Sequence, residues 1–387
     1  MTDSVRSFSV LVLLILINYF LSFSPAVALA AKSGDNFQER SSCFIQELAR
    51  NLDLRGEIGF DVAGEKRFSI KPGNVGRTSR RQFKTTSVKV DMSSIFNQIE
   101  IGVKPRWEWD TQGEGDFFIN EWFAKYMLRD DFFILYGREI LQWGPSCLLS
   151  PSNPFSTDNG RDNPKRELAG SDFGRIVWIP SYEWTVSFIA NTDKGRRTVP
   201  EFKKAYALKA DYTGQEKYFS MVFSHREPDR SRIGFFGSWT AFEALVLYAE
   251  GSMWEFDNDT KVILGASYTP EMGCTITVEY FYNEEGNAND PIYSCLLRAN
   301  SIDTLLRQNY ILLQYIDIPR LNDSLHLTLR GILNLDDESS KLIGVAEYDL
   351  GNYTQLFGVG SFSLRGDKDS EFGIVDYSVM GGIRFSF

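Results

Sequence analysis

Apolar and polar side chains alternate along most of the chain beyond about residue 53, in runs of roughly ten residues. In residues 99–109 every odd position is apolar and every even position is charged or glycine, and residues 182–188, 275–280 and 325–330 alternate in the same way. Successive side chains of a β-strand point to opposite faces, so this pattern predicts strands with one apolar and one polar face. About ten residues is also the length with which a tilted strand crosses a bilayer. Alternation alone would equally fit a soluble β-sandwich with one wet face.

Two features of these runs favour a membrane barrel over a sandwich. Large aromatic side chains such as Trp107 and Trp109 lie near the ends of the apolar stripes, where the boundary between lipid and water would be, whereas a sandwich core would place them centrally. The predicted strands are also long and numerous, and no amphipathic helices accompany them to cover a second face. We therefore predict an all-β fold, a transmembrane antiparallel up-and-down β-barrel.

The connections between the runs give a second reason for a barrel. The runs predict about eighteen strands, an even number as in bacterial barrels, and sixteen stays open because a miscounted pair leaves the parity unchanged. With the amino terminus in the periplasm, connections after odd-numbered strands should be extracellular and long, and the others short. Long connections are predicted at 64–82, 140–171, 191–202, 284–305 and 364–375, all after odd strands. The predicted strand cores are 53–63, 83–91, 97–109, 118–129, 132–139, 172–179, 182–190, 203–212, 217–225, 231–239, 243–254, 260–269, 273–283, 306–316, 322–333, 341–349, 352–363 and 376–387.

The carboxy-terminal residues 377–387 form an alternating run that ends on an aromatic residue. Tyr377, Ile383, Phe385 and Phe387 share its apolar face. A last strand of this kind resembles the assembly signal of bacterial outer-membrane β-barrels. The resemblance implies that these four residues are recognised by the barrel-insertion machinery.

Residues 1–30 have the organisation of a secretory signal peptide. Arg6 supplies the basic region, an apolar stretch follows over 10–21, and residues 28–30 read Ala-Leu-Ala before the predicted cleavage site; a retained anchor helix is the alternative. Residues 31–52 form a separate leader. It is either a short amphipathic helix over 37–52, inside the barrel or at its periplasmic mouth, or a flexible segment. The barrel itself is predicted over 53–387.

The composition narrows the classes of function. Of 387 residues, 41 are basic and 51 acidic, and the net charge of −10 argues against a nucleic-acid partner. The two histidines are predicted at opposite ends of the barrel, and no G-x-S-x-G, H-E-x-x-H or C-x-x-C motif occurs, so we predict no catalytic residue, no metal site and no cofactor. Three disulfide pairings are open to an exported chain, although free loop thiols are the simpler interpretation; the four cysteines are Cys43, Cys147, Cys274 and Cys295.

A barrel of this width encloses water, and the polar alternate positions should line its lumen. Side chains of both signs would orient dipolar solutes or select ions there, although any polar lumen also needs hydrophilic side chains. The predicted lumen-facing charges are Glu100, Lys104, Arg106, Glu108, Lys125, Arg129, Lys209, Asp211, Glu279, Arg330 and Arg384.

The longest connection, 140–171, is rich in proline and asparagine and carries Arg161, Lys165 and Arg166. Loops of this length are usually functional or disordered, and we predict that this one folds inward and narrows the lumen. Arg138 lies just before it and is predicted to line the constriction or anchor the loop, with a structural salt bridge to a wall carboxylate as the alternative. The acidic residues 336–338 at the predicted rim could bind Ca²⁺ or bridge lipopolysaccharide phosphates, or simply be solvated.

Part of the chain resembles a known family. Residues 136–145 contain a G-R-x-x-x-x-W-G turn, preceded by Ile-Asn-Glu-Trp-Phe at 119–123 and followed by Asn-Pro-Phe at 153–155, and residues 279–283 read Glu-Tyr-Phe-Tyr-Asn. These segments are similar to porin-like outer-membrane proteins, including uncharacterised and alginate-export-like families, and cover about a tenth of the chain. The resemblance implies a β-barrel channel of the outer membrane. The family pattern often has Gln where this chain has Glu139.

The sequence therefore predicts an outer-membrane channel, not an enzyme, for passive passage of small hydrophilic solutes or of an exported polymer. The alternative is a structural or adhesive barrel, plugged by residues 140–171 and the leader, whose extracellular loops bind a partner. The predicted partners are outer-membrane lipid and lipopolysaccharide, the barrel-insertion machinery through the C-terminal strand, and a small hydrophilic solute or polysaccharide.

Overall fold

The computed structural model describes residues 52–386, except for 69–77, 111–113, 164, 198–201, 228–230, 255–258, 272, 289, 299–304, 318–323 and 368. The predictions for the signal peptide and the leader fall on residues outside this range, as do Cys43 and Phe387. The described residues form β-strands and, between two of them, the short helix α4 (Ile292–Arg298).

The predicted count of eighteen strands is confirmed, and sixteen is excluded. Each predicted core overlaps one observed strand, because the period-two alternation continues through nearly the whole of each strand. The strands are β1 (Asp53–Phe68), β2 (Thr78–Phe96), β3 (Ile99–Asp110), β4 (Gly115–Arg129), β5 (Phe132–Glu139), β6 (Ser171–Ser181), β7 (Trp184–Asp193), β8 (Ala205–Thr213), β9 (Lys217–Arg226), β10 (Ser231–Phe242), β11 (Leu245–Trp254), β12 (Lys261–Tyr268), β13 (Thr275–Asn283), β14 (Asn309–Ile316), β15 (Leu325–Asn334), β16 (Ser340–Gly351), β17 (Thr354–Arg365) and β18 (Val375–Ser386).

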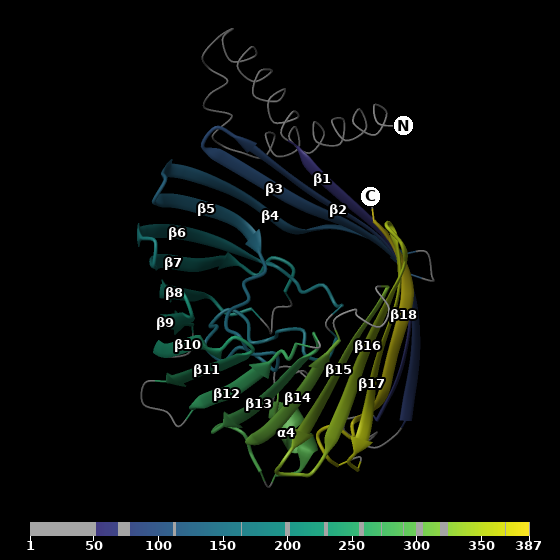
Figure 1. The fold of residues 1–387 in the computed structure, drawn as a ribbon. Coiled ribbons are helices and arrows are strands. Elements are labelled where there is room, and N and C mark those ends of the chain that lie inside the picture. The colour runs from purple at the N-terminus through teal and green to yellow at the C-terminus, as the bar shows by residue number, and fades with distance from the viewer. Residues whose placement is uncertain are drawn as a thin grey trace.

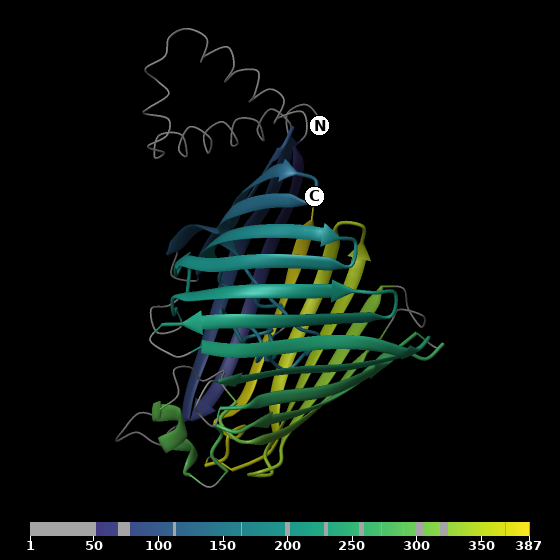
Figure 2. The same ribbon diagram turned by 90° about the vertical axis from the view of Figure 1, so that its left-hand side faces the viewer.

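The strands form one antiparallel sheet that closes on itself. Each strand pairs with its neighbours in sequence, and the ring is closed by β1 and β18, where Ile58 pairs with Phe385 and Val62 with Gly381. Figure 1 shows the ring of strands, and Figure 2 shows their tilt and places the carboxy terminus at the end opposite α4. The predicted all-β, antiparallel, up-and-down barrel is therefore confirmed.

The outer surface of the wall is apolar. In β13 the side chains of Ile276, Val278 and Tyr280 are exposed, whereas those of Thr277 and Glu279 between them are buried against the interior. The same alternation exposes large apolar side chains on the strands all around the ring. A continuous apolar surface of this extent is typical of contact with lipid rather than with water.

Exposed aromatic side chains gather near the ends of the strands. Trp184 begins β7, Trp239 and Phe242 lie near the end of β10, and Tyr353 lies in the turn between β16 and β17. Trp109 is exposed near the opposite end of the barrel, where β3 ends. Aromatic rings with one polar edge favour the boundary between hydrocarbon and water, so these positions indicate where a bilayer would begin and end.

The connections follow the predicted parity with one difference. Most connections after even strands are short turns such as 97–98, 130–131 and 352–353, those after β12 and β14 are longer at 269–274 and 317–324, and the longest connections lie at the α4 end. The predicted connection 64–82 is shorter than expected, because β1 and β2 stay paired as far as Phe68 and Thr78. Residues 64–67 and 78–82 lack an apolar face, which is why alternation does not reveal them, but backbone pairing does not need one.

Residues 140–170, which connect β5 to β6, lie inside the ring of strands (Figure 1). Leu148 and Leu149 of this loop pack against buried side chains of β12 to β16, among them Ile263 and Phe281. Leu141 and Phe155 pack against a second cluster on β6 to β10. The apolar core is therefore built between the loop and the inner wall. Across the described ranges, no helix is long and apolar enough to cross a membrane.

Candidate functional site

The inward loop starts and ends at one point of the wall. Arg138, near the end of β5, forms a bidentate ion pair with Asp172 at the start of β6, with Nε–Oδ1 and Nη2–Oδ2 distances of 2.6 and 3.2 Å. It also donates to the carbonyl of Ile119 at 3.1 Å. Arg138 shares a strand face with Ile134 and Tyr136, which are exposed on the outer surface, so its strand position faces away from the lumen. The structure thus places Arg138 as a clamp on the two ends of the loop.

Two glycines shape the turn into the lumen. Gly137 lies against the carbonyl oxygen of Trp122, with no room for a Cβ atom. Gly144 has a φ of 76°, and a Cβ atom there would collide with the carboxylate of Glu250 on β11. Glycine is the residue that accepts both the close approach and the left-handed conformation. The G-R-x-x-x-x-W-G segment therefore has a geometric role in this chain.

The Asn-Pro-Phe segment closes the same turn. The Asn153 amide donates to the carbonyl of Leu141 at 2.8 Å, and its oxygen accepts from the backbone N–H of Phe155 at 3.0 Å. The Phe155 ring packs edge-on between Trp143 and Phe173, with centroid distances of 5.6 and 5.0 Å. The two motifs of the loop are thus held against each other and against β6.

A buried carboxylate on β13 holds the tip of the loop. Glu279 is fully buried and accepts hydrogen bonds from the Ser146 hydroxyl at 2.9 Å and from the backbone N–H groups of Cys147 and Leu148 at 2.6 and 3.0 Å. The Tyr248 hydroxyl on β11 donates a fourth bond at 2.6 Å. Four donors converge on this one side chain, so the cluster fixes the height and direction of the tip.

A second carboxylate on β11 repeats the arrangement. Glu250, also fully buried, accepts from the Ser150 hydroxyl at 2.5 Å, and from the backbone N–H and hydroxyl of Ser152 at 3.1 and 2.7 Å. Among the described residues, neither Glu250 nor Glu279 has a cationic partner within ion-pair distance. Hydrogen-bond donors of the loop therefore provide most of the hydrogen bonds that water would otherwise make to these two buried carboxyl groups.

Ion pairs attach the next part of the loop to β16. Asp162 pairs with the neighbouring Arg161 at 3.2 Å and with Lys341 of β16 at 2.8 Å. Burial raises the pKa of Asp162, but these two cations outweigh it and hold that pKa well below its ordinary value. Lys165 pairs with Glu347 of β16.

Wall arginines complete the attachment at both sides of the lumen. Arg330 of β15 donates to the carbonyl of Arg161 at 2.8 Å. On the other side, Arg106 of β3 is buried and pairs with Glu167 of the loop at 2.7 Å and with Asp91 of β2 at 2.8 Å. The loop therefore crosses the lumen, from β11 and β13 past β15 and β16 to β3.

The segment that reaches β3 borders a cavity of about 310 Å³ between the loop and the wall. Both signs of charge face it: Lys104, Arg106 and Arg166 are cationic, and Glu121 and Glu167 are anionic. Opposed charges across a narrow aqueous passage create a transverse field, which orients dipolar solutes. The remaining lining residues are Ile140, Gln142, Asn159, Gly160 and Leu168.

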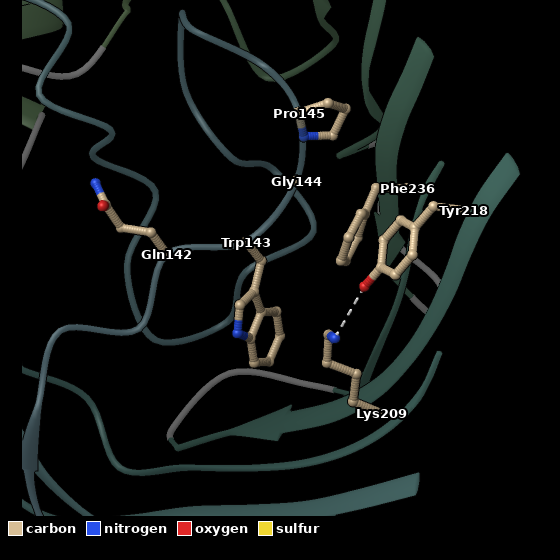
Figure 3. A pocket seen from close by; sticks show the side chains of 7 residues that line it. All are labelled: Gln142, Trp143, Gly144, Pro145, Lys209, Tyr218 and Phe236. Carbon is tan, nitrogen blue, oxygen red and sulfur yellow. Dashed lines mark hydrogen bonds between the residues drawn. The ribbon is translucent and has the colours of Figure 1, made fainter. Parts of the chain in front are cut away.

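A second cavity, of about 300 Å³, separates the loop from β8 to β10 (Figure 3). Trp143 of the loop lies on one side, Tyr218 and Phe236 lie on the other, and Lys209 lies at the edge. Lys209 pairs with Asp211, which also accepts from the Tyr218 hydroxyl. The predicted lumen charges Lys209 and Asp211 are thus mutually neutralised beside an aromatic surface.

Inward charges of β1 to β4 form a different kind of pair. Lys104 and Glu121 are 2.6 Å apart with side chains 36% and 19% exposed, and Lys125 lies 3.0 Å from Glu100. Arg384 of β18 lies over the Phe357 ring, 4.3 Å from its centroid. These side chains keep part of their surface accessible, in contrast to the fully buried carboxylates under the loop.

The structure places the other predicted residues as follows. Arg106, Glu279 and Arg330 contact the loop, as described above, whereas Arg129 lies at the turn between β4 and β5. Arg129 is 68% exposed and pairs with Asp131 at 3.2 Å, so it belongs to the rim. Glu108 lies on β3 next to its end at Asp110. Tyr377, Ile383 and Phe385 lie on β18, which closes the barrel.

Some residues of the site escaped the sequence analysis. Glu250 follows the same inward alternation as Glu279, so the signal was present but was not singled out. The partners Asp162, Glu167 and Lys341 carried no signal, since nothing in the alternation reveals which loop residue meets which strand. Of the cysteines, Cys147, Cys274 and Cys295 are free. His225 lies 3.4 Å from Ser231, and His326 lies 3.2 Å from Asp349 at the opposite barrel end.

Comparison with known proteins gives only a distant likeness. No protein-family model matches the chain, and no curated protein matches it. Two engineered variants of the porin of Rhodopseudomonas blastica have similar solved structures, with TM-scores of 0.49 and 0.48 and sequence identities of 9% and 10%. Each alignment covers 87% of this chain and 100% of the porin. At this distance the likeness carries no information about solute or mechanism.

Proposed function

We propose that the chain is an outer-membrane channel of the porin type for passive passage of small hydrophilic solutes, with residues 140–170 as its constriction. The unequal burial of the inner wall carries this proposal. The loop buries inward side chains of β11 to β15 such as Glu250, Glu279 and Arg330. Three ion pairs of β1 to β4 remain partly exposed, which are Lys89–Glu57, Lys104–Glu121 and Lys125–Glu100. Ionised side chains are stable where water reaches them, so a water-filled path beside the loop accounts for the difference.

The outer surface supports the membrane part of the proposal. Exposed apolar side chains surround the barrel, and aromatic side chains mark both ends of that surface. The orientation follows from the two ends of the barrel: the end with the short turns faces the periplasm, and the end with α4 and the long connections faces outward. In this proposal residues 1–30 direct export, and β18 with Tyr377, Ile383, Phe385 and Phe387 is recognised by the barrel-insertion machinery.

The charges beside the loop favour small polar solutes over an exported polymer. The cavity against β3 and β4 has about 310 Å³ and is crossed by pairs of opposite charge. A polymer chain would have to slide past these pairs without stopping, whereas a small dipolar solute can orient in the field and leave.

Recording single channels in planar bilayers tests the proposal. The full chain, purified in detergent, should give stepwise conductance. Replacing residues 146–160 with a glycine-serine linker of equal length should raise the unit conductance several-fold, because the linker removes the contacts with Glu250 and Glu279. The matched control replaces residues 255–258, after β11, in the same way and should leave the conductance unchanged.

Two results would contradict the proposal. Folded protein that shows no conductance, with and without the loop replacement, would exclude a channel. Conductance that appears only after the loop is replaced would instead favour the plugged barrel, whose role would be structural or adhesive. Heat-modifiable migration on an SDS gel confirms that each variant is folded before it is recorded.

A further inference from the structure

The hairpin of β1 and β2 is strongly basic in a chain whose net charge is −10. Exposed cations lie on its second strand, close to the long connections at the α4 end. Against the single acid Glu65, residues 65–84 contain seven cations, which are Lys66, Arg67, Lys71, Arg77, Arg80, Arg81 and Lys84. The fold does not require this clustering of positive charge, which instead indicates that the hairpin binds an anionic partner.

The strand register shows which way these cations face. Lys84 pairs with Val62, whose side chain is 55% exposed on the outer surface, and Arg80 pairs with Lys66 on the same face. Arg81 pairs with Glu65 and therefore belongs to the opposite face, together with Asp61. Arg80 and Lys84 thus point outward from the barrel, and Arg81 points to the lumen side.

The neighbouring strand shows the level at which these cations lie. Thr86 pairs with Trp109, the exposed aromatic side chain near the end of β3. Lys84 lies two residues beyond Thr86 on the same face, and Arg80 lies six residues beyond it. With a rise of about 3.4 Å per residue, these distances are about 7 and 20 Å along a tilted strand. Lys84 is therefore at headgroup level, and Arg80 is above it.

Within the part of the chain that the structure describes, the two outward cations have no counter-charge. Lys66 pairs with Asp376 and Lys89 pairs with Glu57, so these two neighbouring cations of the hairpin already have acidic partners. Among the described residues, neither Arg80 nor Lys84 forms a hydrogen bond or ion pair. Two unpaired cations on one face of one strand, directly above an apolar surface, match an anion that lies at the surface of the bilayer.

We propose that Arg80 and Lys84 bind the phosphate groups of a glycolipid of the outer leaflet, the lipid A part of lipopolysaccharide, beside the seam where β1 meets β18. This inference rests on the proposed orientation in the outer membrane. The acyl chains would lie along the exposed side chains of Phe60 and Val62, below the cations. Arginine and lysine both bind phosphate, arginine with two parallel hydrogen bonds and lysine as a point charge.

Native mass spectrometry of the full chain in detergent tests this site. Wild type is titrated with purified lipid A that carries its phosphates. The double variant Arg80→Gln/Lys84→Gln should bind it at least about tenfold more weakly, since each basic residue near an anionic lipid surface contributes measurably. The matched control Arg81→Gln removes a charge from the same strand on the other face, and should stay within about twofold of wild type.

Two further arms distinguish the source of the phosphate. Lipid A without phosphates should bind wild type as weakly as phosphorylated lipid A binds the double variant. Inorganic phosphate should fail to displace the lipid, because a free anion lacks the acyl chains. Equal loss in Arg81→Gln and in the double variant, equal binding of the dephosphorylated lipid, or full displacement by inorganic phosphate would each overturn the proposal. None of these readouts depends on conductance, so the channel proposal succeeds or fails separately.

Discussion

The two halves of the inner wall obey the same alternation but use it differently. Under the loop, Glu250 and Glu279 are fully buried and accept hydrogen bonds from loop hydroxyl and backbone N–H groups. On β3 and β4, Lys104 and Glu121 pair with each other and keep part of their surface exposed. The polar face of a barrel strand therefore seats the loop at Glu250 and Glu279 and, in the proposed channel, lines the passage at Lys104 and Glu121.

This difference has an energetic side. A buried carboxylate that loses its donors keeps its desolvation cost, so each anchor under the loop matters individually. An exposed ion pair contributes about 0 to 1 kcal/mol, so the open half tolerates change. Mutations should therefore separate the halves: those under the loop should alter loop position and stability, and those on β1 to β4 should alter the passage of ions.

The largest effect is expected for Glu279→Ala. The four donors that bind Glu279 would lose their acceptor in a buried site. The free energy of unfolding should therefore fall by about 3 kcal/mol. The released loop tip should also raise the mean conductance and its fluctuations. Denaturant-induced unfolding followed by gel migration measures the first quantity, and bilayer recording measures the second. Glu100→Ala, which breaks the partly exposed pair with Lys125, is the control and should cost less than about 1 kcal/mol. Equal losses in the two variants would remove the distinction between the halves.

Gly144→Ala should have the next largest effect. The left-handed φ of 76° and the collision with the Glu250 carboxylate should cost about 1 to 3 kcal/mol. Gly358→Ala on β17 is the matched control, since a Cβ atom there meets nothing within 4 Å. Its unfolding free energy should change by less than about 0.5 kcal/mol. If both variants unfold like wild type, the turn at Gly144 does not hold the loop in place.

A third prediction concerns pH at the α4 end of the covered half. Glu371, in the connection 366–374, accepts from Tyr310, Leu306 and Asn334 at 2.6 to 2.9 Å. Burial raises the pKa of Glu371 from 4.5 to about 7. The folded state thus binds a proton that the unfolded state has lost, and the stabilisation present below pH about 4.5 declines as the pH rises to about 7. Proteolysis of this connection should accelerate over that interval.

The variant Glu371→Gln gives the control for this pH effect. It keeps the size of the side chain but cannot ionise, so its proteolysis rate, corrected for the protease's own pH profile on unfolded substrate, should not change between pH 4.5 and 7. A wild-type rate that is equally flat would show that Glu371 does not control the docking of the connection.

Lys104→Glu should have the smallest effect on stability, but it should clearly change the ion selectivity. The side chain is 36% exposed and borders the cavity beside the loop, so the fold should be unaffected within about 1 kcal/mol. Replacing a positive by a negative charge there should shift the reversal potential under a salt gradient toward cation selectivity. Lys217→Glu, on an exposed position at the short turn before β9, is the control and should leave the reversal potential unchanged. The same shift in both variants would place the selective region elsewhere.

The sequence predicted the fold well because a barrel wall repeats one rule. Alternation located every strand and the even count, but it missed residues 92–96 of β2 and the polar ends of β1 and β2 at 64–67 and 78–82. Those ends are held by backbone pairing alone, and backbone pairing leaves no trace in the order of side chains.

The site was predicted less completely. Alternation indicated that Arg106, Glu279 and Arg330 face inward, and the length of 140–171 indicated a functional loop. Which of them meet was not predictable, because Ser146 and Glu279 are 133 residues apart and Arg106 and Glu167 are 61 apart. Arg138 shows the same limit: its position before the loop was informative, but its ion pair with Asp172 on the outward side of the strand depends on the register of β5 and β6.

The seam between β1 and β18 has a consequence for biogenesis. The first and last strands of the barrel are mutual partners, so a chain that lacks its last segment is an open sheet with two unpaired edges. The loop at 140–170 is also made before the strands that receive it, from β11 to β16. A truncated or stalled chain would therefore carry free edges and an unseated loop together, and would be a substrate for aggregation or for quality-control proteases until the final strand is in place.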